Sequence, residues 1–82
     1  MTLGARIKCL LKFKGLTQKD LAQGIGVNQC AITRWANNLL KPNVDNLEKI
    51  ANFFEITLFE LLGYSKTFDD LLEAYDKGKL VA

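Results

Sequence analysis

Apolar residues recur along this chain at the three- and four-residue spacing of a helix, and no segment shows the strict alternation of a strand. The first stripe predicts a helix that stops at Gly15. Its apolar positions are Leu3, Ile7, Leu10 and Leu11. The same spacing then repeats in short segments separated by glycine and asparagine. We therefore expect an all-α fold in which five compact helices are followed by a sixth.

Two of the predicted helices follow one another with almost no linker. Thr17 suits the N-cap of a helix over residues 18–25, and Gly26 suits a left-handed residue that ends it. Asn28 can cap the next helix, residues 29–37. Two helices joined by a tight turn that contains glycine are typical of a helix-turn-helix unit.

The next two helices have similar boundary signals. A fourth helix begins at Asn43 or Asp45, after a loop marked by proline. Thr57 and Glu60 form a capping box that starts a fifth helix, which Gly63 closes.

A sixth helix is expected over residues 68–77, capped by Thr67 and ended by Gly78. Its apolar stripe must pack against another apolar surface. One interpretation is that the helix folds back on the fourth and fifth helices of its own chain. The other is that, with the fifth helix, it forms a two-fold interface between two copies. The residues of that interface would be Phe59, Phe68, Leu71, Leu72 and Tyr75.

Length and composition indicate one globular domain, because the chain has 82 residues and 49% of them are hydrophobic. The initial Met suggests a complete chain. We find no apolar run long enough to span a membrane and no signal-peptide pattern, so we expect a cytoplasmic protein with no membrane partner.

Charge is distributed unevenly along the chain. Residues 1–43 hold seven basic residues and one acidic residue, a net +6, whereas residues 44–82 hold four basic and eight acidic residues, a net −4. A basic half beside an acidic half suggests that a polyanion faces one side only. The alternative is a chance excess on solvated helix faces.

Catalytic and metal-binding chemistry has little support in the sequence. The chain has no histidine, and Cys9 and Cys30 match no zinc spacing, so we expect reduced thiols, no metal and no cofactor. The pair Asp69-Asp70 is expected on a solvated acidic helix without a partner for acid–base work. We therefore expect no enzyme activity and no small-molecule ligand.

The predicted helix over residues 29–37 has two different faces. One face is apolar and consists of Ala31, Ile32, Trp35 and Ala36. The other carries hydrogen-bonding groups and no carboxylate, and consists of Gln29, Cys30, Thr33, Arg34 and Asn37. In the major groove of duplex DNA, glutamine can pair with adenine, arginine can pair with guanine, and a threonine methyl can touch thymine. An ordinary solvated face is the alternative.

The segment from Leu16 to Gly63 resembles the Cro/repressor-type (XRE-like) helix-turn-helix family. The resemblance covers about residues 3–63 and depends on a set of short motifs. These are Leu16-Thr17-Gln18, Leu21-Ala22, Gly26-Val27, Ile32-Thr33-Arg34-Trp35, Pro42, Leu47, Ala51 and Leu61-Leu62-Gly63. It implies a DNA-binding domain over residues 1–63 and a C-terminal helical extension over 64–82. It also implies a dimeric transcriptional regulator, a repressor, on palindromic duplex DNA.

The resemblance also implies roles for single residues. Those that would read bases are Gln29, Cys30, Thr33 and Arg34. Those that would contact the DNA backbone are Gln18, Lys19, Asn37, Lys41 and Asn43. Gln18 would also brace Gln29 when the protein is docked on DNA.

Several positions depart from the family pattern. Cys30 is a poor hydrogen-bonding group for base reading, Ala36 replaces a common acidic residue, and Glu55 stands where a glycine is usual, which predicts a strained turn. Phe53 and Phe59 occupy positions that are often polar.

Two other functions stay open: an antitoxin-like regulator whose acidic half holds a protein partner, and a redox sensor through Cys30.

Overall fold

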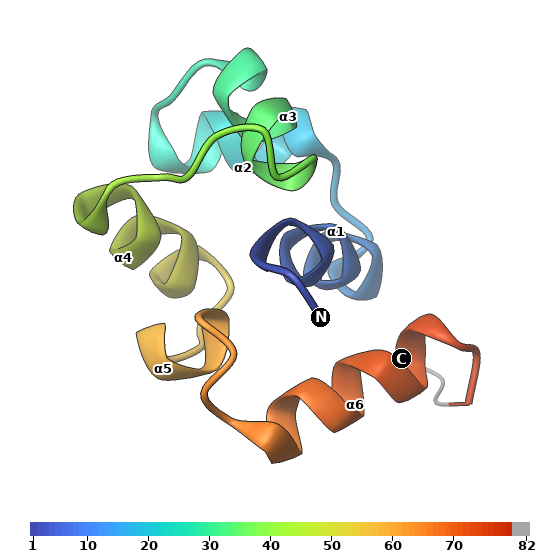
Figure 1. The fold of residues 1–82 in the computed structure, drawn as a ribbon. Helices are drawn as coiled ribbons and strands as arrows, with labels where there is room; N and C mark the ends of the chain where they lie inside the picture. Colours follow the sequence, from blue (N-terminus) through green and yellow to red (C-terminus); the bar gives the residue numbers. More distant parts are fainter. Residues whose placement is uncertain (80–82) are drawn as a thin grey trace.

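The computed structural model describes residues 1–79, and within them the chain forms helices and no strand, which confirms the predicted all-α class. The six helices are α1 (Leu3–Lys14), α2 (Gln18–Ile25), α3 (Gln29–Ala36), α4 (Val44–Phe53), α5 (Leu58–Leu61) and α6 (Lys66–Asp76). Figure 1 shows α1 near the middle of the molecule, with α2 and α3 on one side of it and α6 on the other.

Short polar side chains start the helices, as the sequence predicts. Thr17 and Thr57 each form a full capping box, with Asp20 and Glu60 as the acidic partners. Of the two candidates for the start of α4, Asn43 is the N-cap, and its side chain accepts a hydrogen bond from the backbone of Asn46. These caps satisfy backbone N–H groups that would otherwise lack a partner at each helix start.

The core is built from one fully buried aliphatic side chain on each of the first five helices. These residues are Ile7, Leu21, Ile32, Ile50 and Leu61, each with no exposed surface. Phe54, at the end of α4, is almost as deeply buried. One shared core therefore fixes α2 and α3 relative to the rest of the domain.

A glycine lets α1 lie close to the end of α3. A Cβ atom at Gly4 would lie 2.4 Å from the backbone oxygen of Ala36, so a larger residue does not fit without movement of one helix. The backbone N–H of Gly4 donates to Asn38 Oδ1 at 3.0 Å, and Asn38 Nδ2 donates to Thr2 Oγ1 at 3.0 Å. The N-terminus of α1 thereby holds the turn that follows α3.

The start of the sixth helix is not where the sequence suggested. The predicted N-cap was Thr67, but Ser65 caps the helix, and its Oγ accepts from the backbone N–H of Phe68 at 3.2 Å. Thr67 lies inside the first turn. The helix therefore begins earlier than predicted and ends at Asp76.

The main packing partner of α6 is α1, which corrects one of the two interpretations, the one in which α6 folds back on α4 and α5. Leu72 is 6% exposed and joins the core, and its backbone oxygen accepts from Cys9 Sγ at 3.4 Å. The rings of Phe13 and Tyr75 meet edge to face with their centroids 5.1 Å apart. Burial of the Cys9 side chain raises the pKa of its thiol.

An ion pair joins the same two helices, and it corrects the view of Asp69 as a solvated carboxylate. Arg6 donates to both carboxylate oxygens of Asp69, each at 2.9 Å. The side chains are only 9% and 16% exposed. The hydrogen bonds from the guanidinium hold the pKa of Asp69 below its ordinary value. Arg6 is thus buried and paired, so it is not available to a polyanion.

Candidate nucleic-acid interface

The turn between α2 and α3 has the geometry that the sequence predicts. Gly26 has a left-handed backbone, with φ of 73°, and its N–H donates to the backbone oxygen of Ala22 in the last turn of α2. The next backbone N–H, from Val27, also donates to Ala22 O, at 3.0 Å. Asn28 then caps α3 by accepting from the backbone N–H of Cys30 at 2.8 Å. The chain therefore leaves one helix and starts the next with only three residues between them.

The two predicted faces of α3 are confirmed. Ile32, Trp35 and Ala36 are buried against the rest of the domain, at 0%, 4% and 1% exposure, and Ala31 is partly buried against the core. The opposite face is exposed throughout, and its residues are Gln29, Cys30, Thr33, Arg34 and Asn37. A rigid row of polar side chains with a firmly packed back can meet a partner without rearranging the core.

A hydrogen bond across the two helices supports this row. Thr33 Oγ1 lies 2.8 Å from Gln18 Oε1 and 3.2 Å from the backbone oxygen of Gln29, and can donate its hydrogen to either. Gln18, at the start of α2, is therefore connected to the middle of α3. Within residues 1–79 no hydrogen bond joins the Gln18 and Gln29 side chains, so the brace that is present runs through Thr33.

The residues predicted to contact a nucleic-acid backbone surround this row, and most of them are exposed. Lys19 lies at the start of α2, and Asn37, Lys41 and Asn43 lie at or after the end of α3; all four are exposed, whereas Gln18 is partly buried. The Oδ1 atom of Asn43 is occupied in capping α4, which leaves the amide N–H groups of that side chain for a partner.

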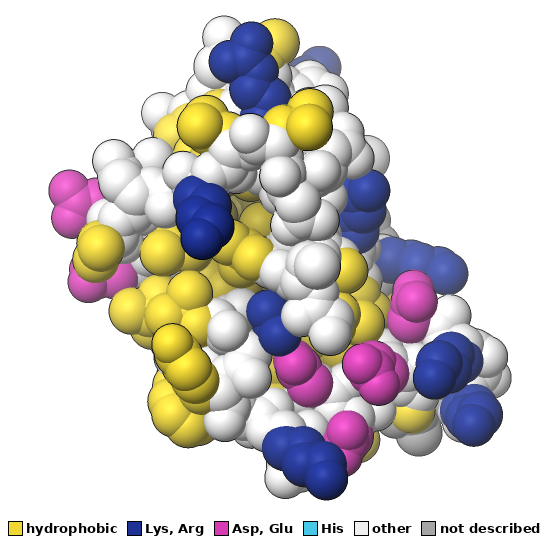
Figure 2. All heavy atoms as spheres, viewed as in Figure 1, with side chains coloured by type: hydrophobic (Ala, Val, Ile, Leu, Met, Phe, Trp, Pro, Cys, Tyr) yellow, Lys and Arg dark blue, Asp and Glu magenta, His cyan; other side chains and the backbone are white. Residues whose placement is uncertain are grey.

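The electrostatics of this region favour an anion. The salt bridges present within residues 1–79 join Arg6 to Asp69 and the Met1 amino group to Glu73, so Lys19, Arg34 and Lys41 carry unpaired charges. Asp20 accepts from the Thr17 backbone at 2.8 Å, and this hydrogen bond lowers the pKa of the Asp20 carboxyl. In Figure 2 the acidic side chains in view lie over α4 and α6, where basic side chains also lie, and none in view lies over α3.

Sequence reasoning missed one residue that shapes the site. Asn38 adopts a left-handed backbone, with φ of 58°, and its side chain ties the turn after α3 to Thr2 and Gly4. The signal was present, because asparagine is the residue other than glycine that most readily takes this conformation. The hydrogen bonds to α1 were not visible in the sequence.

The described part of the chain has neither a membrane-spanning helix nor a metal-binding cluster. No helix there is long and apolar enough to cross a membrane. No group of three or more His, Cys, Asp and Glu side chains within residues 1–79 could hold a metal ion.

Known proteins are similar to this chain in sequence. A helix-turn-helix family model matches residues 10–61. The HTH-type transcriptional activator BcrR of Enterococcus faecalis is 36% identical over 62 residues, which are 76% of this chain and 30% of that protein. The cryptic phage CTXphi transcriptional repressor RstR of Vibrio cholerae is 29% identical over 63 residues, which are 77% of this chain and 57% of that protein.

The HTH-type transcriptional regulator ImmR of Bacillus subtilis (strain 168) is also 29% identical over 63 residues, which are 77% of this chain and 50% of that protein. The chain thus spans between 30% and 57% of the length of the curated relatives it matches. No solved structure matches it significantly. Because the family model covers more than half of the chain, the chain belongs to the Cro/repressor-type (XRE-like) helix-turn-helix family.

Proposed function

We propose that this chain binds duplex DNA in a sequence-specific way, with α3 in the major groove, and regulates transcription. The observation that carries the proposal is the exposed face of α3, which is polar, free of carboxylates and backed by a buried apolar face. A helix with its side chains is about 10–12 Å in diameter. α3 therefore fits a groove about 12 Å wide.

In this proposal Gln29, Cys30, Thr33 and Arg34 face base edges. Gln29, as the first residue of α3, reaches furthest into the groove, and its amide matches the donor and acceptor of adenine. Arg34 matches the two acceptors of guanine. The Thr33 hydroxyl stays with Gln18, so its methyl group is the part left to touch thymine.

Contacts to phosphate would come from the residues around α3. Lys19 and Lys41 supply flexible positive charges on either side, and Gln18, Asn37 and Asn43 supply neutral donors. Such contacts set the register of the helix in the groove and carry no sequence information of their own.

One recognition helix reads only a few base pairs, so the proposal includes a homodimer with two copies of α3 about 34 Å apart on a palindromic site. The names of the relatives include a repressor and an activator. We propose a repressor, because a dimer that occupies an operator hinders polymerase by its presence alone, whereas activation needs an additional contact.

The test is selection from a randomised duplex library, followed by binding of variants to every single-base change in the selected site. Gln29→Ala is expected to cost on the order of 1–3 kcal/mol on the preferred site and to relax one base position. Lys41→Ala is expected to weaken all sequences about equally, because an ammonium group meets phosphate.

Gln23→Ala is the matched control, since Gln23 is an exposed glutamine on α2 and lies outside the α3 face. It should leave the preference unchanged. A Gln29→Ala protein that keeps the full wild-type preference would show that α3 is not the reading helix, and a wild-type protein that selects no sequence would refute the proposed function itself.

A further inference from the structure

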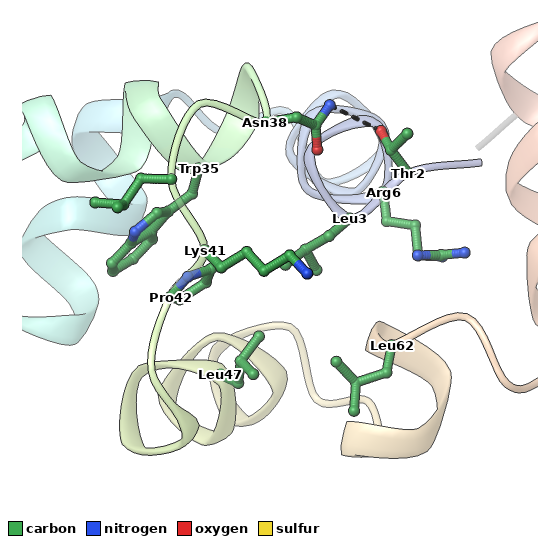
Figure 3. A pocket seen from close by; sticks show the side chains of 10 residues that line it. Thr2, Leu3, Arg6, Trp35, Asn38, Lys41, Pro42, Leu47 and Leu62 are labelled. Atoms are coloured by element: carbon green, nitrogen blue, oxygen red, sulfur yellow. Dashed lines mark hydrogen bonds between the residues drawn. The ribbon is translucent and has the colours of Figure 1, made fainter.

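A hollow of about 440 Å³ lies between the N-terminus of α1, the loop after α3 and the facing sides of α4 and α5. Figure 3 shows Leu47 and Leu62 facing it from α4 and the end of α5, with Trp35 and Pro42 on the other side. Its apolar walls are Leu3, Trp35, Leu40, Pro42, Leu47 and Leu62. Pockets of roughly 300–1,000 Å³ with mostly apolar walls are those that hold small organic molecules.

Most polar groups at the hollow already have partners inside the protein. Hydrogen bonds to the N-terminus of α1 hold the Asn38 side chain, and Arg6 donates to Asp69 through Nε and Nη2. Lys41 is exposed and forms no salt bridge within residues 1–79. Among the residues that the structure describes, no carboxylate side chain lines the hollow. Lys41 therefore supplies the available charge of this site, and that charge is positive.

The Lys41 side chain is directed toward the hollow. Figure 3 shows it extending from the loop after α3 into the space between α1 and α5. The apolar stem of a lysine can lie along apolar surface while its ammonium group stays at the water boundary. The hollow thus combines an apolar interior with one cation at its rim.

We propose that this hollow is an effector site for a small apolar monocarboxylate, whose carboxylate pairs with Lys41 and whose apolar body packs among the leucines and Trp35. Charge complementarity decides the class of ligand. An uncharged molecule would leave the ammonium group without a partner, and an amine would face it with a like charge. The sequence predicted no small-molecule ligand, because the walls come from separate segments of the chain that only the fold brings together.

The site would regulate DNA binding, and in this respect the inference rests on the proposed function, in which Lys41 contacts phosphate. One ammonium group cannot pair fully with a ligand carboxylate and a phosphate at once. The ligand would weaken binding to all sequences about equally, since a phosphate contact carries no sequence information. With Lys41 occupied in both subunits, the slope of log affinity against log salt would change from about −4 to about −2. The ligand would thus act as an inducer.

A second apolar groove provides an internal control. It has a volume of about 490 Å³ and lies between α1 and α6, with Phe13 and Tyr75 among its lining residues. Its two charged lining residues are Lys14 and Glu55, which have opposite signs. An anion would be attracted by one and repelled by the other, so this groove should show no preference for a carboxylate.

Isothermal titration calorimetry without DNA compares phenylbutyrate with phenylbutanol, its uncharged analogue. The wild type is expected to bind the carboxylate about fivefold more tightly, as a partly exposed ion pair allows. Trp35 is the only tryptophan of the chain and lines the hollow, so its fluorescence reports whether the probe enters there.

Two lysine substitutions locate the site. Lys41→Met is expected to abolish the preference for the carboxylate, and Lys14→Met to leave it unchanged. Both lysines are exposed, and circular dichroism checks the fold; if Lys41→Met fails to fold, Lys41→Gln provides the same test. Equal affinities of the wild type for the two probes, a preference that survives loss of the Lys41 charge, a preference lost in Lys14→Met, or binding without a change in Trp35 fluorescence would overturn the inference.

Binding to DNA separates this inference from the proposed function. Saturating sodium phenylbutyrate should weaken binding of the wild type to its selected duplex, relative to sodium chloride at the same concentration, and should leave the affinity of Lys41→Met unchanged. A wild-type affinity for DNA that phenylbutyrate does not change would overturn the inference, although sequence-specific binding would stand. A wild type that selects no sequence would refute the proposed function, whereas the titrations without DNA would still decide whether the hollow binds a carboxylate.

Discussion

The ion pair between Arg6 and Asp69 should stabilise the fold measurably, because it joins α1 to α6 and is largely removed from water. Removal of one partner from a buried pair typically costs 3–5 kcal/mol, since the other charge stays buried without a counter-ion. Asp69→Asn keeps the shape of the side chain and one acceptor oxygen, and Asp69 is 16% exposed. We therefore expect a cost below that range, about 2 kcal/mol.

Thermal and urea unfolding followed by circular dichroism at pH 7 measure this cost. About 2 kcal/mol corresponds to a decrease in Tm of roughly 8–16 °C for a domain of this size. Asp70→Asn is the matched control, because Asp70 is the exposed neighbour on the same helix, and it should change stability by less than about 0.5 kcal/mol. Equal effects of the two substitutions would refute the reasoning.

The dependence of stability on pH gives a second measure of the same pair. The pKa of Asp69 lies below its ordinary value of 3.8 in the folded chain. A lowered folded pKa means that the stabilisation is complete above the unfolded value and is lost as the pH falls through the folded value. The difference in stability between wild type and Asp69→Asn should thus be constant at neutral pH and shrink below about pH 4. A difference that grows on acidification would contradict this assignment.

Three other predictions follow from the contacts described. The unpaired Lys19 and Lys41 of two subunits should neutralise about four phosphates, so a plot of log affinity against log salt should have a slope of about −4; affinity that does not change with salt would exclude backbone contacts. Gly4→Ala should destabilise the fold by about 1–3 kcal/mol in urea unfolding, since its Cβ would lie 2.4 Å from Ala36 O, and unchanged stability would contradict that close approach. Glu55→Gly should stabilise by about 0.5–1 kcal/mol, because Glu55 has a φ of 58° and a side chain strains this conformation; a loss of stability in the same assay would show that the Glu55 side chain makes a contact that outweighs the strain.

Local chemistry made most helix boundaries predictable. A hydroxyl side chain three residues before an acidic residue can form a capping box in any fold. Thr17 and Thr57 could therefore be identified as N-caps without knowledge of the fold. The start of α6 was predicted wrongly because Thr67 stands three residues before Asp70, whereas Ser65, the observed N-cap, stands three residues before Phe68 and lacks this signal. The start at Lys66 places Asp69 in the first turn of the helix, where its carboxylate is favoured and also meets Arg6.

Long-range packing was much less predictable. Helical spacing revealed that α6 has an apolar stripe, but an apolar stripe packs equally well on any apolar neighbour. The choice of α1 depends on the ion pair with Arg6 and on the thiol of Cys9, which reaches a backbone oxygen of α6. These contacts join residues 63 positions apart. Residue type alone gave no indication that Arg6 and Asp69 would be partners.

The candidate site shows the same division between periodicity and packing. The two faces of α3 follow from helical spacing, so the exposed row could be predicted residue by residue. Which polar groups in and around that row remain free depends on hydrogen bonds within the protein. The Thr33 hydroxyl is hydrogen-bonded to Gln18, and the Asn43 side-chain oxygen accepts a hydrogen bond that caps α4. Likewise Arg6 counts toward the basic half of the sequence but is neutralised by Asp69. Fewer polar and charged side chains are therefore free to bind DNA than the sequence suggests. Those that remain are the side chains without a partner inside the protein.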